Sequence, residues 1–380
     1  MDEKEGHDFM GGRVEETIYC EGCGAVIQTE DKTKAGYVPK AALANQQVIC
    51  QRCFRLTHYN EVQDVEYTDD DYLRMIQQIS DTNSLVVKIV DIFDFDGSFI
   101  SGLKRLVGNN PIVLIGNKLD LLPKSTNHNK LIHWMKKTAS DYGLKVQDVF
   151  LVSATKGIGF EKVEQELDKH RKHKDVYVVG CTNVGKSTFI NQLIHRSSGV
   201  KDAITTSYFP GTTLGFIQIP LDDTSYLYDT PGVVNRSQLV HYVTDKDLKL
   251  IHPKKEIKPR IYQLQDKQTL FFGGFARFDI EKGMKQSFVC YFSNQLMIHR
   301  TKLEQADTFY EKHIGELLQP PSPATLEQLP PLVAQTIKIP REKTDIVIPG
   351  LGWLTVTEGG ITVTVHVPKG NQITLRPALI

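Results

Sequence analysis

Residues 180–187 read GCTNVGKS, which are the residue types of a loop that binds phosphate groups. In the pattern GxxxxGK[ST], glycines let backbone N–H groups surround a β-phosphate, Lys186 reaches the β- and γ-phosphate oxygens, and the Ser187 hydroxyl ligates Mg²⁺. We expect a buried strand at 175–179 before this loop and a helix at 187–196 after it, whose N-terminus also favours an anion. The predicted phosphate contacts are Gly180, Asn183, Val184, Gly185, Lys186, Ser187 and Thr188.

Two segments farther along the chain have the residues to complete a Mg²⁺ nucleotide site. Residues 229–232 read DTPG, so Asp229 would hold Mg²⁺ through water and Gly232 would sense a γ-phosphate. The alternative is a plain surface turn, since Asp, Pro and Gly favour turns, but the phosphate loop upstream favours the nucleotide interpretation. Between the phosphate loop and the DTPG segment, residues 209–213 read FPGTT, where a threonine hydroxyl would complete the Mg²⁺ shell. The catalytic candidates are therefore Lys186, Thr213 and Gly232, with Thr212 in reserve for Thr213.

Residues 117–120 read NKLD and carry the side chains of a base-recognition loop. Asp120 is suited to accept hydrogen bonds from guanine N1–H and from the exocyclic amine, a donor pair that adenine lacks. Buried polar groups reject a base that leaves them unpaired. Asn117 would brace the loop and the stem of Lys118 would cover one face of the ring. The same four residues are also common in surface turns, so the segment alone leaves both interpretations open.

Residues 153–155 read SAT and supply the second element expected around a guanine base. The Ala154 N–H would point to guanine O6, with Ser153 and Thr155 shaping the loop and Lys156 available to pack on the ring. Such a short segment means little without the base-recognition loop at 117–120.

Both guanine segments precede the phosphate loop, which reverses their usual order and indicates a circularly permuted GTPase. Alternating strands and helices predict a doubly wound, mostly parallel α/β sheet with ligand loops at the carboxyl ends of the strands. Because domain termini commonly lie close together, joining the old ends and cutting elsewhere preserves such a site. The expected strands are 85–90, 111–115, 148–152, 175–179, 214–219 and 225–228, and the expected helices are 99–107, 129–142, 159–170 and 187–196.

Two CxxC pairs near the N-terminus predict a metal site. Cys20 and Cys23 form the first pair and Cys50 and Cys53 the second, with 26 residues between the pairs. Four thiolates at this spacing suit a closed tetrahedral Zn²⁺ site with a structural role. A redox pair is the alternative, although one CxxC would suffice for it and neither stands in a thioredoxin-like context. The residues that flank the second pair could form either an RNA contact or a solvated surface; they are Arg52, Arg55, His58 and Tyr59.

The order NKLD, SAT, GxxNxGKS, PGTT and DTPG behind a cysteine module resembles the YqeH family of circularly permuted GTPases. The resemblance implies GTP/GDP, Mg²⁺ and Zn²⁺ as ligands and a role in small ribosomal subunit assembly, with the subunit or its precursor and rRNA as partners. It extends to 91–98, which is similar to the family's DxxDxxGS segment, and to 345–353, a signature of no assigned chemistry. Val233 stands where Ras-type enzymes have the glutamine that orients water, which implies slow hydrolysis without a partner. Asn183 resembles the asparagine with which potassium-stimulated relatives help to hold K⁺.

Composition limits the remaining possibilities. The 380 residues carry 45 Lys+Arg and 45 Asp+Glu and are 40% hydrophobic, as expected for a globular protein of two or three domains. We expect a zinc module at 1–60, the permuted GTPase domain at 61–240 and an α+β domain at 241–380. The start lacks a basic and apolar signal region, and no run of eighteen apolar residues occurs, which predicts a cytoplasmic protein with no membrane partner.

Charge is uneven along the chain. Residues 1–83 hold 8 Lys+Arg against 16 Asp+Glu, a difference of −8, whereas residues 241–302 hold 12 against 6, a difference of +6. The basic stretch could form an RNA surface, although strand aromatics are more often core and basic loops are often only solvated. Its candidates are Lys254, Lys255, Lys258, Arg260, Phe271, Phe272, Phe275 and Phe278. Elsewhere in this domain we expect strands at 269–280, 285–293, 345–348, 352–357, 360–367 and 372–375, a helix at 302–318, and a proline-rich linker at 320–331.

These observations lead to two hypotheses for the function. In the first, GTP orders the loops around Thr213 and Gly232, the C-terminal domain changes posture, and affinity for rRNA or a precursor subunit changes until hydrolysis resets the switch. In the second, the chain is an RNA-binding scaffold whose nucleotide site is mainly structural.

Overall fold

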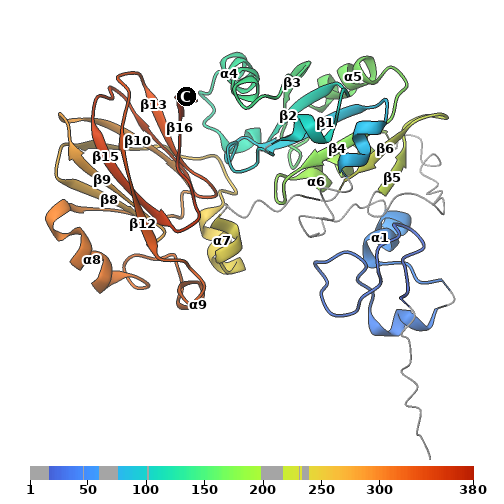
Figure 1. Ribbon diagram of the computed structural model, residues 1–380, viewed down its shortest axis with the longest axis horizontal. Coiled ribbons are helices and arrows are strands. Elements are labelled where there is room, and N and C mark those ends of the chain that lie inside the picture. Colours follow the sequence, from blue (N-terminus) through green and yellow to red (C-terminus); the bar gives the residue numbers. More distant parts are fainter. Residues whose placement is uncertain are drawn as a thin grey trace, which may run out of the picture.

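The computed structural model describes residues 17–45, 47–59, 76–100, 102–197, 217–230, 232 and 239–380. They form three parts, which Figure 1 shows in blue, in cyan to green, and in yellow to red. We call them the cysteine module (17–59), the central domain (76–232) and the C-terminal domain (239–380). The predicted residues Thr212, Thr213 and Val233 lie outside the described residues.

The central domain is built on a six-stranded sheet of order β3-β2-β1-β4-β6-β5. Neighbouring strands are parallel except for β5 and β6, which are antiparallel. The middle strands are buried along their whole length, as expected for a parallel sheet with both faces covered. The predicted doubly wound sheet is confirmed. The strands are β1 (Leu85–Asp91), β2 (Ile112–Asn117), β3 (Asp148–Leu151), β4 (Val176–Gly180), β5 (Ile217–Pro220) and β6 (Tyr226–Asp229).

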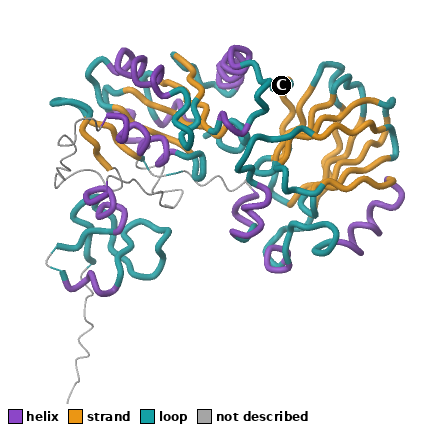
Figure 2. Tube along the Cα trace, turned by 180° about the vertical axis from the view of Figure 1, so that it is seen from behind, coloured by secondary structure: helices purple, strands orange, loops and turns teal. Residues whose placement is uncertain are grey.

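Helices cover both faces of this sheet, and three of the four expected ones begin and end within two residues of their predicted bounds. They are α4 (His128–Asp141), α5 (Phe160–Arg171) and α6 (Lys186–Ser197). Helices α5 and α6 lie side by side on one face of the sheet, where the ring centroids of Phe160 and Phe189 are 5.2 Å apart and Arg196 pairs with Glu164 (Figures 1 and 2). Because the β2–β3 and β3–β4 connections run in opposite directions along the sheet, α4 covers the other face. The prediction of a helix at 99–107 is wrong, since only α3 (Leu103–Leu106) is helical. Gly102 has φ +73°, a left-handed conformation at which α3 begins, and Phe99 and Ile100 lie outside the helix.

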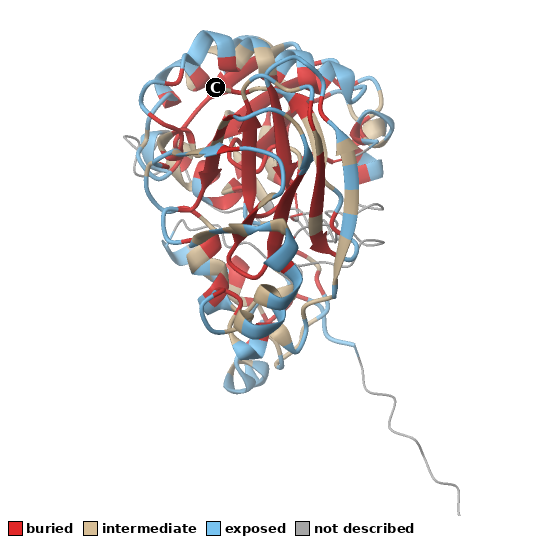
Figure 3. Ribbon diagram, turned by 90° about the vertical axis from the view of Figure 1, so that its left-hand side faces the viewer, coloured by how far each residue is buried: buried red, intermediate tan, exposed pale blue. Residues whose placement is uncertain are grey.

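The C-terminal domain consists mainly of two five-stranded sheets with orders β16-β13-β14-β10-β7 and β11-β8-β9-β15-β12. Their facing side chains form one apolar core, which includes stacked Phe272 and Phe292, and Figure 3 shows the buried strands in red. The strands are β7 (Arg260–Leu264), β8 (Gln268–Phe272), β9 (Ala276–Lys282), β10 (Gln286–Phe292), β11 (Ile298–Lys302), β12 (Leu332–Lys338), β13 (Thr344–Ile348), β14 (Gly352–Val356), β15 (Thr362–Pro368) and β16 (Thr374–Pro377). The helices are α7 (Asp245–Ile251), α8 (Ala306–His313) and α9 (Pro323–Leu326).

Several predictions for this domain are corrected. The expected strand at 269–280 is two strands, β8 and β9, which turn at Gly273 and Gly274. The expected helix at 302–318 shrinks to α8, and the expected linker at 320–331 holds α9 and a backbone hydrogen bond of 2.8 Å from Gly274 N–H to Pro320 O. The strands β7, β11 and β12 were not predicted, because each holds at most one buried residue and so carries little apolar signal.

The aromatic residues proposed for RNA stacking belong to the core instead. Phe271, Phe272 and Phe275 are 0% exposed and Phe278 is 1% exposed, so none presents a ring to a nucleic acid base. Phe272, Phe275 and Phe278 pack in the main apolar core of this domain, whereas Phe271 packs against Phe309 and Tyr310 of α8. An RNA contact on this domain would therefore be electrostatic rather than a stacking platform.

The central and C-terminal domains share a continuous apolar core. Trp353 of β14 is fully buried in the core cluster of the central sheet, with its ring centroid 5.7 Å from that of Phe93. Beside it, Arg376 of β16 lies 5.3 Å from the Trp353 ring centroid and 4.9 Å from that of Trp134, and it pairs with Asp96. The two sequence segments without assigned chemistry, 91–98 and 345–353, thus meet at this interface.

Candidate guanine nucleotide site

The nucleotide motifs meet at one edge of the central sheet because they follow the carboxyl ends of parallel strands. Asn117 ends β2, Gly180 ends β4 and Asp229 ends β6. Asn117 Nδ2 donates to Val184 O at 2.9 Å, which ties the base-recognition loop directly to the phosphate loop. At Gly185, φ is +84° and a Cβ would lie only 2.5 Å from Asn117 Nδ2, so this contact requires glycine.

A cavity of about 570 Å³ opens beside these loops and has the lining expected of a guanine site. Asp120 lines it, and Asp120 Oδ1 is buried without a hydrogen-bond partner among the described residues. Because a buried acceptor without a partner is costly, this oxygen is suited to the N1–H and amine donors of guanine. Eight predicted contact residues line the cavity: Asn117, Lys118, Asp120, Ala154, Thr155, Asn183, Gly185 and Thr188.

Two polar groups of the base loops differ from expectation. The Ala154 N–H, for which we predicted guanine O6 as the acceptor, donates to Asn117 Oδ1 at 3.0 Å. Lys118 Nζ pairs with Asp91 Oδ2 at 2.6 Å and donates to Asn183 O at 2.7 Å, so it links the cavity to the 91–98 segment. Ser153 is buried and its Oγ accepts from Lys156 N–H at 3.2 Å, a role in shaping the loop.

One wall of the cavity comes from the C-terminal domain, which sequence reasoning missed. Leu248 and Lys249 of α7 line it, together with His252, Pro253 and Lys254. Burial, and secondarily the charge of Lys118, lowers the pKa of His252 to about 4, so this imidazole is neutral beside the cavity. The sequence carried a basic run here, but nothing in its pattern indicated that the run faces the base.

Helix α7 is fixed to the C-terminal domain rather than to the central domain. Asp247 Oδ2 accepts hydrogen bonds of 2.7 Å from both the backbone N–H and the hydroxyl of Ser322. Ile251, at the end of the helix, belongs to the core between the two C-terminal sheets. A ligand in the cavity would therefore contact both domains at once.

The phosphate side of the site centres on Asp229, which is fully buried. Lys186 Nζ lies 2.5 Å from Asp229 Oδ1, and a nitrogen of the Arg52 guanidinium lies 2.5 Å from Oδ2. Arg52 comes from α1 (Gln51–Tyr59) of the cysteine module and is 4% exposed, which corrects its assignment to an RNA-facing surface. Arg55, His58 and Tyr59 of the same helix remain candidates for that surface.

The donor set at this edge fits a hard cation such as Mg²⁺. Asp229 supplies a carboxylate and Ser187, buried at the start of α6, supplies a hydroxyl. Gly232 lies against the phosphate loop, since a Cβ at this position would be 3.1 Å from Thr182 Cγ2. Asp229 and Gly232 thus both lie beside the phosphate loop, and their roles toward Mg²⁺ and a γ-phosphate stay predictions.

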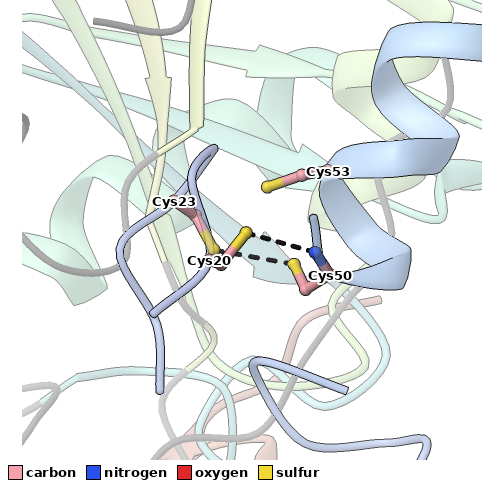
Figure 4. A group of neighbouring side chains, drawn as sticks. All are labelled: Cys20, Cys23, Cys50 and Cys53. Atoms are coloured by element: carbon pink, nitrogen blue, oxygen red, sulfur yellow. Dashed lines mark hydrogen bonds between the residues drawn. The ribbon is translucent and has the colours of Figure 1, made fainter. Parts of the chain in front are cut away.

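The four N-terminal cysteines form a buried cluster with the geometry of a metal site. Their Sγ atoms all lie within 4.8 Å of one another and none is in a disulfide (Figure 4). Cys23 Sγ and Cys50 Sγ are 3.7 Å apart. Tetrahedral Zn²⁺ with Zn–S bonds of about 2.3 Å would space its sulfurs by about 3.8 Å. Cys50 N–H donates to Cys20 Sγ at 3.2 Å, which favours a thiolate there, and Cys53 joins from α1. The cluster therefore fits zinc.

In the part of the chain that the structure describes, none of the helices combines the length and the hydropathy needed to cross a bilayer.

Comparisons with known proteins identify relatives of this chain. A family model described as 50S ribosome-binding GTPase matches residues 175–270, and one described as YqeH-like, C-terminal matches residues 285–379. The uncharacterized protein YqeH of Bacillus subtilis (strain 168) is 60% identical over 365 residues, which covers 96% of this chain and 100% of that protein. The NO-associated protein 1, chloroplastic/mitochondrial, of Arabidopsis thaliana is 32% identical over 427 residues, 95% of this chain and 76% of that protein.

Among solved structures, GNP-bound YlqF from T. maritima aligns with a TM-score of 0.29 and 22% identity over 42% of this chain and 57% of that chain. The near full-length match to the Bacillus subtilis protein decides the family. Its phosphate loop follows its guanine loops in the sequence, and both lie at one edge of a mostly parallel sheet; the chain belongs to the YqeH family of circularly permuted GTPases.

Proposed function

We propose that this GTPase is a guanine-nucleotide switch that acts in the cytoplasm in assembly of the small ribosomal subunit, through contact with rRNA. The observation that carries the proposal is the shared cavity: α7 of the C-terminal domain forms one wall of the site that receives guanine. A nucleotide that fills this cavity adds contacts between the two domains. A bound nucleotide would therefore also affect α7 and the surface of the C-terminal domain beside it.

That surface is basic. Lys249 and Lys254 line the cavity and are exposed, and Lys255 and Lys258 continue the run with exposed side chains. Ammonium groups near one another attract a phosphate backbone without reading its sequence, and such binding weakens steeply as salt rises. With the aromatic rings buried, these lysines are the proposed rRNA contact.

The proposed cations follow from the donor set. Ser187, Asp229 and Thr213 would hold Mg²⁺, which supplies charge stabilisation at the β- and γ-phosphates when bound. Lys186 would leave Asp229 for the phosphate oxygens, because the phosphates carry more negative charge than the carboxylate. The backbone at Asn183, with φ +62°, curves around the phosphate side, where its side chain would help to hold K⁺.

Potassium should matter for turnover under this proposal. With valine at position 233 in place of a water-orienting glutamine, we expect GTP hydrolysis to be slow and to rise several-fold when K⁺ replaces Na⁺ at equal ionic strength. Phosphate release measured in both salts checks this expectation, and Asn183→Ala should lose the difference. Equal rates in the two salts would remove Asn183 from the proposed role.

Cosedimentation tests the assembly role. The purified protein would be spun with small and with large ribosomal subunits, each with a non-hydrolysable GTP analogue and with GDP. We expect binding to the small subunit that depends on the analogue, and weaker binding by a Lys254→Glu, Lys255→Glu, Lys258→Glu variant. Binding only to the large subunit, the partner named by the family model for 175–270, would redirect the proposal. Nucleotide-independent binding, with no phosphate release stimulated by subunits, would favour the scaffold hypothesis.

A further inference from the structure

The Arg52–Asp229 ion pair joins the two metal centres proposed for this chain. The two residues are 177 positions apart, their side chains are 3% and 0% exposed, and their polar atoms are 2.5 Å apart. Arg52 directly precedes Cys53 in α1, so the cysteine cluster fixes the position of the helix that carries it. On the other side, Asp229 is the carboxylate assigned to Mg²⁺.

The charges around Asp229 indicate that Mg²⁺ would compete with the side chains of Lys186 and Arg52 for this carboxylate. In the structure, Lys186 and Arg52 each occupy one oxygen of this carboxylate, so both of its acceptor positions already face a cation. A Mg²⁺ ion near Asp229 would repel both side chains. Lys186 has another partner available, since the phosphates of a bound nucleotide accept it. A hydrated Mg²⁺ beside Asp229 would use the same carboxylate charge and repel the Arg52 guanidinium, so we expect Arg52 to turn away or to withdraw with α1.

We propose that Arg52 is a positioning residue of the GTPase site, which keeps the cysteine module docked while Asp229 is free of Mg²⁺ and releases the module when Mg²⁺ and GTP bind. This inference rests on the proposed Mg²⁺ role of Asp229. A ligand shifts an equilibrium only by its differential affinity for the two states. Mg²⁺ favours the released state and Arg52 the docked state, so each opposes the other.

The coupling works in both directions. Because linkage between two binding sites is reciprocal, a module that Zn²⁺ holds in shape should weaken Mg²⁺ binding, and Mg²⁺ with GTP should weaken the hold of the module on Zn²⁺. Coupling energies of this kind commonly change affinities by about 5- to 150-fold. The effect is therefore large enough to measure in either direction.

The first test follows Mg²⁺ binding in the full, zinc-loaded chain. A fluorescent GTP analogue at fixed concentration would be titrated with Mg²⁺ and its emission recorded. We expect Arg52→Ala to lower the half-saturating Mg²⁺ concentration about tenfold and Arg52→Lys to lower it less, because lysine keeps the charge without the planar fork. Lys40→Ala, which removes an exposed charge from the same module, is the matched control and should behave as the parent chain. An unchanged or raised Mg²⁺ requirement in Arg52→Ala would overturn the inference.

Two further measurements protect this test. The zinc content and the helical signal of each variant show whether the module has folded. If Arg52→Ala loses zinc, the Mg²⁺ titration of Arg52→Lys is the test of the inference. Asp229→Asn separates the two proposals. If this variant leaves the Mg²⁺ requirement unchanged, the assignment of Asp229 to Mg²⁺ fails. If Asp229→Asn changes the Mg²⁺ requirement but Arg52→Ala does not, only the proposed role of Arg52 fails.

The second test needs no mutation. Transfer of Zn²⁺ from the parent chain to a chromogenic chelator would be timed with GDP alone and with Mg²⁺ plus a non-hydrolysable GTP analogue. We expect transfer to be several-fold faster with Mg²⁺ and the analogue, since docking protects the module. Equal rates would contradict the proposed release.

Discussion

The cysteine module and the C-terminal domain both contact the central domain, but by different means. The C-terminal domain contributes Val347, Trp353 and Leu379 to the apolar core of the central sheet. The cysteine module has its own small core around the four cysteines and reaches the central domain through the buried pair of Arg52 with Asp229. Apolar contact is indifferent to nucleotide charge, whereas an ion pair at the phosphate edge is not. We therefore expect the nucleotide to act on the docking of the module, as proposed above.

This comparison changes how the switch is expected to work. From the sequence we expected the C-terminal domain to change posture with nucleotide, because the Asp229 segment runs directly into it. The shared core and the buried contacts of Arg376 argue against a swing of that domain as a rigid body. Its response to nucleotide should be local, at the α7 wall of the cavity, while the larger displacement belongs to the cysteine module.

The largest effect is expected from a change in base recognition, in the cavity to which the C-terminal domain contributes α7. Asp120→Asn exchanges an acceptor for a donor at the base edge, so GTP affinity should fall on the order of a hundredfold or more and xanthine nucleotides should bind better in return. Competition between the two nucleotides for the cavity measures the ratio. Lys249→Ala, which changes the α7 wall without touching the base edge, should keep the preference for guanine. Unchanged GTP affinity in Asp120→Asn would remove Asp120 from its role.

Arg376 tests whether the C-terminal domain is held as firmly as its contacts indicate. The guanidinium lies between two tryptophan rings and pairs with Asp96 and Asp345, and burial raises the pKa of Asp345. Arg376→Ala leaves both carboxylates without this partner, and we expect a loss of about 3–5 kcal/mol in the free energy of unfolding. Urea unfolding measures it, with Arg341→Ala, an exposed arginine of the same domain, as the control. A loss as small as in the control would mean that the contact is not a strong one.

His252 gives a smaller, pH-dependent effect at the α7 wall. Because burial lowers its pKa to about 4, the unfolded chain binds a proton between pH 6.5 and 4 that the folded chain refuses. Stability should therefore fall by roughly 3 kcal/mol as pH drops through this window, and be fully present above it. Unfolding free energies of the parent chain and His252→Gln, measured from pH 7 to pH 4, isolate this contribution. If His133→Gln, an exposed histidine control, flattened the curve equally, His252 would not be its source.

The sequence predicted which loops meet at this edge of the sheet because each of their patterns is local. The spacing of Gly185, Lys186 and Ser187 determines one loop, and the strands before Asn117 and Asp229 bring those loops to a common edge. The cysteine pairs likewise specify their own cluster. In each case the pattern is complete within a few residues, or within two short segments that a metal would bind.

The missed features of the site depend on contacts between distant segments. The Arg52–Asp229 pair spans 177 positions and the pair of Arg376 with Asp96 spans 280, and no periodicity within either segment encodes such pairings. The α7 wall depends on how one domain docks on another. Local conformation also overrode pattern at Gly102, whose positive φ shortened a helix that the apolar spacing favoured.

Hydrogen–deuterium exchange of the full chain tests the difference between the two contacts most directly. Amide exchange would be compared with GDP and with Mg²⁺ plus a non-hydrolysable GTP analogue, following α1 (Gln51–Tyr59) and the strands β13 and β14. We predict faster exchange in α1 with Mg²⁺ and the analogue, and no change in β13 and β14. The opposite pattern, with α1 unchanged and the C-terminal strands opening, would contradict the account.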